Sequence, residues 1–132
     1  MSDAASVLDW LQQYNTNSKT CWVAGFSFGA WVAMQLLMRR PELNGFISVS
    51  PPANIRDFSF LAPCPSSGLI VHGDKDNIAS FDSSKILAEK LQKQKKVDIK
   101  FKPIKGADHF YENFAEEFSN IVDNYIKDSL KS

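Results

Sequence analysis

The pattern from which the architecture of this chain can be predicted is Thr20-Cys-Trp-Val-Ala-Gly-Phe-Ser-Phe-Gly29. Its first six residues, through Gly25, form a short apolar run that ends in glycine, which is typical of a strand covered on both faces. Residues 27–39 then follow helical spacing, with apolar side chains at Ala30, Ala33, Leu36 and Leu37. The stretch therefore predicts a buried strand, a sharp turn at Ser27 and a helix.

Segments of the same two kinds alternate along the rest of the chain. Apolar runs predict two further strands, at residues 46–49 and 69–71, and alternation of apolar and polar residues predicts a fourth, more exposed strand at residues 97–104. Amphipathic spacing predicts helices over residues 3–14, over residues 82–94 and from Phe114 to Ile126. Such alternation favours a parallel sheet covered by helices. We expect one domain over residues 1–132, a three-layer α/β/α arrangement around a short, mostly parallel four-stranded sheet.

Composition excludes several classes of partner. Fifteen basic residues balance fifteen acidic ones, so no net field exists to attract nucleic acid or an anionic membrane. Two cysteines form neither a CxxC nor a Cys/His pattern, and the sequence predicts no metal site and no cofactor. No signal-peptide pattern and no apolar run of membrane-spanning length is present, so we expect a cytoplasmic protein.

The pentapeptide Gly25-Phe26-Ser27-Phe28-Gly29 has the form G-x-S-x-G between a predicted strand and a predicted helix. A serine at so sharp a turn projects its hydroxyl above the sheet, and the glycines let strand and helix approach closely. The backbone N–H of Phe28, at the start of the helix, can donate to a developing oxyanion. The pattern predicts that Ser27 is a nucleophile.

Two aspartates follow the third predicted strand, in His72-Gly73-Asp74-Lys75-Asp76. Ligands bind beyond the carboxyl ends of parallel strands, so this loop shares an edge of the sheet with Ser27. One aspartate is expected to be a catalytic acid and the other a turn residue that bonds its own backbone. The residues alone leave Asp74 and Asp76 open.

The candidate base is His109, in Gly106-Ala107-Asp108-His109-Phe110 after the fourth predicted strand. A serine nucleophile needs a base within hydrogen-bond reach and a carboxylate to orient the other ring nitrogen. His109 fits this role better than His72, which lies on a predicted strand and is expected to point into the structure.

These motifs together resemble the α/β-hydrolase superfamily, in which nucleophile, acid and histidine follow in this order. The sequence is most similar to small serine hydrolases of the dienelactone-hydrolase kind, over residues 20–130. The family's H-G-x-x-D and G-x-x-H-F patterns imply that Asp76 is the acid and His109 the base. The resemblance further implies a carboxylic ester or similar small acyl substrate and an open site without a lid domain. Of the aromatic residues that could line this site, Phe26, Phe28, Phe58, Phe60 and Phe110, we expect Phe26 and Phe110 to contact substrate.

The chain departs from the family before residue 20. The family's sheet has eight strands and the nucleophile follows the fifth, whereas only one predicted helix precedes residue 20 here. The absent part includes a loop that supplies the second oxyanion donor, whose loss costs roughly 3–4 kcal/mol of transition-state stabilisation. The strand at residues 20–25 would then be an exposed edge, and we expect a homodimer or a separate N-terminal half to pair there.

Two functions from different classes remain. The first is a serine hydrolase of the carboxylesterase kind that uses Ser27, His109 and Asp76. The alternative is a catalytically weak or inactive fragment that serves as a binding or assembly module. Dehalogenases and epoxide hydrolases are disfavoured, because they would place aspartate where Ser27 stands.

Overall fold

Four parallel strands form the centre of the sheet in the computed structural model, which describes residues 11–17, 20–40, 43, 45–61, 64, 66–94 and 97–130. They are β2 (Thr20–Phe26), β3 (Gly45–Val49), β4 (Ser67–Gly73) and β5 (Ile99–Ile104). They lie side by side in chain order, and each pairs in parallel with the next. Their carboxyl ends therefore meet at one edge of the sheet, as the sequence predicted.

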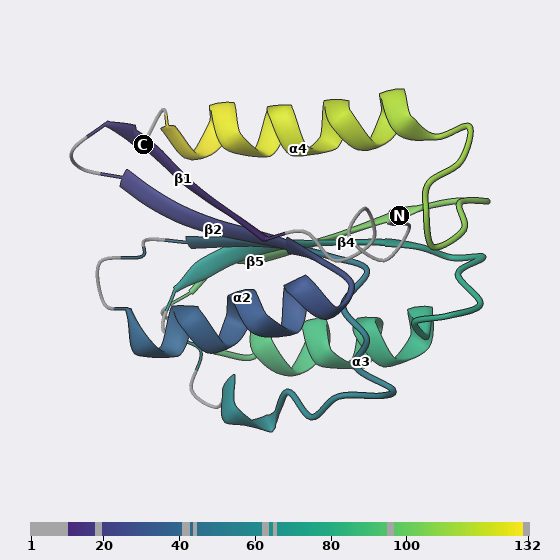
Figure 1. Cartoon of the computed structure of the whole chain (residues 1–132), viewed down its shortest axis with the longest axis horizontal. Helices are drawn as coiled ribbons and strands as arrows, with labels where there is room; N and C mark the ends of the chain where they lie inside the picture. Colours follow the sequence, from purple (N-terminus) through teal and green to yellow (C-terminus); the bar gives the residue numbers. More distant parts are fainter. Residues whose placement is uncertain are drawn as a thin grey trace.

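Helices cover both faces of this sheet (Figure 1). Two helices, α2 (Phe28–Arg39) and α3 (Phe81–Gln92), lie on one face, and α4 (Ala115–Leu130) lies on the other. A short 3₁₀ helix, η1 (Ser59–Leu61), interrupts the loop between β3 and β4. The three-layer α/β/α architecture predicted from the sequence is confirmed. No helix in the described part of the chain is long and apolar enough to span a bilayer.

A fifth strand, β1 (Leu11–Asn17), corrects the predicted N-terminal helix over its last four residues. It runs antiparallel to β2, with Leu11 opposite Gly25 and Tyr14 opposite Trp22. Pairing with β2 satisfies backbone groups that would otherwise form an open edge. The helical pattern rested mainly on apolar residues before Leu11, and residues 3–10 lie outside the described part.

Because β1 occupies the outer side of β2, the exposed edge predicted at residues 20–25 is wrong. A second copy of the chain could pair with β2 only by displacing β1. The homodimer expected from that edge stays a prediction.

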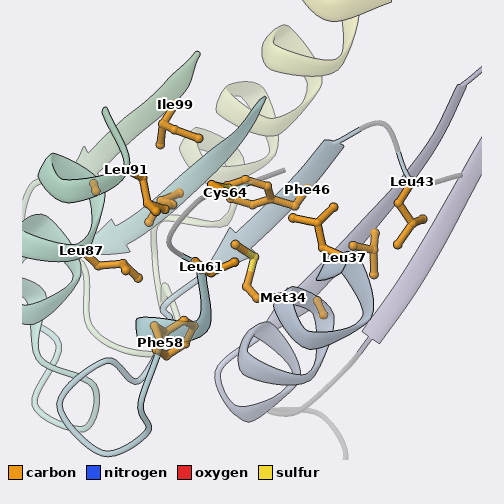
Figure 2. Packing of buried hydrophobic residues seen from close by; sticks show 14 residues of the cluster. Met34, Leu37, Leu43, Phe46, Phe58, Leu61, Cys64, Leu87, Leu91 and Ile99 are labelled. Atoms are coloured by element: carbon orange, nitrogen blue, oxygen red, sulfur yellow. The ribbon is translucent and has the colours of Figure 1, made fainter. Parts of the chain in front are cut away.

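Apolar side chains form two buried clusters, one on each face of the sheet. Neighbouring residues of a strand point to opposite faces, so Phe46 belongs to one cluster and Ile47 to the other. The cluster under α2 and α3 includes Met34, Leu37, Phe46, Leu61, Leu87 and Leu91 (Figure 2). The cluster under α4 includes Ala24, Ile47, Leu69, Val71 and Ile104. The two clusters pack against both faces of the sheet and hold the strands in place. They thereby fix the positions of the loops that follow the carboxyl ends of the strands.

Candidate active site

Ser27 lies at the turn between β2 and α2 in a strained backbone conformation. Its φ is 58° and its ψ is −121°, in the left-handed half of conformational space. Non-glycine residues held in such conformations cost on the order of 1–3 kcal/mol and persist only where the surroundings enforce them. Here the Ser27 N–H donates to the Val49 carbonyl at 2.8 Å, and the Ser27 carbonyl accepts the Ala30 N–H at 2.9 Å. These bonds tie the turn to β3 and to the first turn of α2.

Gly25 allows α2 to begin directly beside the end of β2. A Cβ built at this position would lie 2.1 Å from the carbonyl oxygen of Gly29 and 2.7 Å from the nitrogen of Ala30. Both contacts are with backbone atoms, which no rotamer change can move. The glycine of the sequence motif is therefore required by the approach of helix to strand.

His109 links Ser27 to Asp76. Its Nε2 lies 3.1 Å from the Ser27 Oγ, and its Nδ1 lies 2.7 Å from Oδ2 of Asp76. The imidazole is almost fully buried. Its ring centroid lies 5.1 Å from that of Phe26 and 5.2 Å from that of Phe110, which stands edge-on at 87°. His109 thus lies within hydrogen-bond distance of both Ser27 and Asp76, the other two residues proposed from the sequence.

Asp76 is held by its own loop as well as by His109. Its Oδ1 accepts the backbone N–H groups of Ile78 and Ala79, both at 2.8 Å. Burial acts to raise the pKa of Asp76, but hydrogen bonds from His109, His72 and these two N–H groups outweigh it and hold the pKa well below its ordinary value. The carboxylate is therefore ionised and oriented at neutral pH.

Asp74, the other acid considered from the sequence, has a different contact. Its Oδ1 accepts the N–H of Gly106 at 2.7 Å, and the next residue, Lys75, donates its N–H to the Ala107 carbonyl at 2.9 Å. These bonds fasten the loop after β4 to the loop that carries His109. Of the two aspartates, Asp76 contacts the imidazole.

A second set of hydrogen bonds that holds the His109 loop was not predicted from the sequence. The Tyr111 hydroxyl donates to the Val71 carbonyl at 3.2 Å and lies 2.7 Å from the Ser50 Oγ, which must then donate to it. Burial raises the pKa of Tyr111 above its ordinary value, so the phenol keeps its proton. Ser50 and Tyr111 are separated by 61 residues and belong to no motif, so no local signal could have identified the pair.

The aromatic residues predicted to contact substrate differ in exposure. Phe26 is 5% exposed and packs in the cluster under α4 as well as on His109. Phe110 is 47% exposed and Phe28, at the start of α2, is 38% exposed. Phe110 and Phe28 therefore offer surface to a ligand, whereas Phe26 supports the base from within. No group of three or more histidine, cysteine or acidic residues in the described ranges could hold a metal ion.

Comparisons with known proteins identify the family to which the chain belongs. The family model of the dienelactone hydrolase family matches residues 1–129. An uncharacterised protein of Rickettsia prowazekii is 52% identical over 128 residues, which make up 94% of this chain and 54% of that protein.

Solved structures of related proteins also superpose on this chain. A protein of unknown function from Agrobacterium tumefaciens, considered an α/β hydrolase, superposes with a TM-score of 0.84 at 51% identity, over 86% of this chain and 52% of that one. A serine hydrolase without a lid from Xanthomonas campestris gives a TM-score of 0.67 at 28% identity, over 80% of this chain and 46% of that one. The chain spans about half the length of the relatives it matches. It belongs to the dienelactone hydrolase family and has an α/β-hydrolase fold.

Proposed function

We propose that the chain is a serine hydrolase that cleaves a carboxylic ester or a similar small acyl substrate through Ser27, His109 and Asp76. One observation carries the proposal: His109 spans from the Ser27 Oγ at 3.1 Å to the Asp76 carboxylate at 2.7 Å. Membership of a hydrolase family supports the same reaction class.

In the proposed reaction the Ser27 Oγ attacks the acyl carbon while Nε2 of His109 takes the hydroxyl proton. The tetrahedral intermediate collapses when His109 returns that proton to the leaving alcohol, which leaves an acyl group on Ser27. Water then attacks the acyl carbon with His109 as base again, and the acid product and free Ser27 are released. Asp76 accepts the Nδ1–H throughout and stabilises the imidazolium that forms in each step.

The oxyanion of each tetrahedral intermediate is proposed to lie at the N-terminus of α2. Phe28 opens this helix, and no acidic residue occupies its first turn. The helix dipole and the backbone N–H of Phe28 therefore favour a negative charge beside Ser27. A single donor of this kind is worth roughly 10²–10³ in kcat.

An open site is proposed because the described loop between β3 and β4 is too short to form a lid domain. Residues 50–61, which include η1, form turns and one 3₁₀ helix instead of a lid domain. The exposed rings of Phe28 and Phe110 suit a compact apolar acyl or alcohol group. The Xanthomonas relative, described as lacking a lid, supports an open site.

A fluorophosphonate probe tests the proposal, because it reacts only with an activated serine. We expect the wild-type chain to be labelled at one site and to hydrolyse p-nitrophenyl acetate, and Ser27→Ala to lose both properties. Ser83→Ala, in α3 and outside the relay, is the matched control and should be labelled like the wild type. Absent labelling of the folded wild-type chain at saturating probe would contradict hydrolysis and favour the non-catalytic module.

A further inference from the structure

A second histidine, His72, lies behind the Asp76 carboxylate and has no part in the reaction described above. It is the next-to-last residue of β4 and is fully buried. Its Nε2 lies 2.9 Å from the Ala79 carbonyl oxygen and 3.1 Å from Oδ2 of Asp76. That Oδ2 is also the oxygen that accepts the Nδ1–H of His109 at 2.7 Å. The two imidazoles therefore meet at one carboxylate oxygen.

The oxygens around His72 fix its proton on Nε2. A carbonyl and an ionised carboxylate accept hydrogen bonds and cannot donate them, so the nitrogen that faces both must carry the hydrogen. Nδ1 has no hydrogen-bond partner among the described residues, and a second proton there would be a buried donor without an acceptor. These contacts favour the tautomer of His72 that carries its proton on Nε2. The Phe81 ring meets it at 86° with centroids 5.9 Å apart, which limits its rotation.

We propose that His72 is a positioning residue that sets the orientation of the Asp76 carboxylate and the negative charge this carboxylate presents to His109. The proposal rests on the proposed function. The single N–H of His72 contacts both Asp76 and Ala79 in the loop after β4. The same two residues are also joined by the hydrogen bond from the Ala79 N–H to Oδ1 of Asp76. An N–H dipole beside Oδ2 reduces the charge that this oxygen offers to His109.

Other titratable groups around the cluster are engaged elsewhere or lie in solvent. The carboxylate of Asp74 accepts the Gly106 N–H, and that of Asp108 accepts the N–H groups of Phe110 and Glu112. On the elements packed against β4, Asp82 of α3 and Lys102 of β5 are exposed. Within the described part of the chain, Asp76 is the one carboxylate within hydrogen-bond distance of either imidazole.

Loss of the His72 N–H should therefore act on His109 through Asp76. The carboxylate becomes a stronger acceptor, protonated His109 is favoured, and its titration midpoint moves to higher pH. Because His109 acts as a base in its neutral form, the acidic limb of kcat/KM against pH must move in the same direction. The carboxylate also gains freedom to turn, which lowers kcat.

The test compares His72→Leu, which keeps the apolar bulk and lacks the donor, with His72→Gln, which keeps an amide N–H near the position of Nε2. NMR titration of the His109 ring should show the midpoint raised by roughly half a pH unit or more in the Leu variant. We expect kcat to fall roughly fivefold, the rate equivalent of one ordinary hydrogen bond. The Gln variant should restore both quantities to near the wild-type values. Equal midpoints in all three proteins, or equal shifts in both variants, would overturn the proposal.

A measurement on the wild-type chain covers the case in which the Leu variant does not fold. Nitrogen-15 NMR of the histidine rings should show His72 as the neutral form protonated on Nε2 at pH 7. A cationic ring, or one protonated on Nδ1, would contradict the proposal. Neither NMR experiment requires turnover, so both still decide the role of His72 if the chain proves unable to hydrolyse esters.

Discussion

At the residue scale, the choice between Asp74 and Asp76 shows what side-chain contacts add to sequence. Both aspartates follow β4 within one loop, and both accept a backbone N–H, Asp74 from Gly106 and Asp76 from Ile78 of its own loop. The two carboxylates differ in what else they contact: Asp76 also accepts a hydrogen bond from the imidazole of His109, whereas the contact of Asp74 is with the Gly106 N–H. The two should therefore respond very differently to loss of charge.

Asp76→Asn should lower kcat for ester hydrolysis by roughly 10³–10⁴-fold at neutral pH, because an amide cannot hold the imidazole in the required tautomer or stabilise its cation. Asp74→Asn keeps an oxygen acceptor for the Gly106 N–H, and we expect a loss below roughly tenfold, the cost of loosening one loop bond. Steady-state kinetics with a short-chain p-nitrophenyl ester measure both. Losses of similar size would mean that Asp76 is not the acid.

At the element scale, the contact between β2 and the start of α2 determines where Ser27 lies. Gly25→Ala would place a methyl group within 2.1 Å of the Gly29 carbonyl oxygen, so α2 must move away from the strand. We expect the free energy of unfolding to fall by about 1–3 kcal/mol, and fluorophosphonate labelling of Ser27 to fall with it. Urea denaturation and labelling rate measure the two effects.

Gly45→Ala, in β3, is the control. Its new Cβ would lie 3.1 Å from the Trp22 side chain and 3.2 Å from the Ser67 carbonyl oxygen, contacts that small shifts can relieve. It should destabilise less than Gly25→Ala and leave labelling intact. A larger loss for Gly45→Ala would show that the strand–helix contact is not the critical one.

The sequence predicted elements where local pattern and tertiary environment agree. The strands β2, β3 and β4 are apolar runs, β5 alternates apolar and polar residues, and the helices have one apolar stripe, so all could be located from their patterns. The segment from Leu11 to Asn17 is different, because its strand conformation depends on the open side of β2 and not on its own spacing. The Ser50–Tyr111 bond and the contact of His72 with Asp76 likewise require coordinates, since nothing in residue order specifies which buried polar groups meet.

At the scale of the whole molecule, Asp76 couples the site to folding stability. Its pKa is held below the ordinary value of 3.8 in the folded chain, so the unfolded chain binds the proton more readily. The contribution of Asp76 to stability is therefore fully present well above pH 3.8 and is lost as the pH falls below that value.

Wild type should have a higher Tm than Asp76→Asn at pH 7, and the difference should shrink toward pH 3. Thermal unfolding followed by circular dichroism at both pH values measures it. Asp123→Asn, on the exposed side of α4, is the matched control and should show little difference from wild type at pH 7. A difference in Tm between wild type and Asp76→Asn that grows as the pH falls would contradict the direction of the pKa shift.

The left-handed backbone at residue 27 also limits which amino acids could take the place of serine there. A side chain branched at Cβ is a severe steric outlier at a φ of 58°, whereas an unbranched one is tolerated. Cysteine therefore fits this turn and threonine does not, although both carry a nucleophilic atom on Cβ. The backbone permits an exchange of oxygen for sulfur here, but it forbids one additional methyl group.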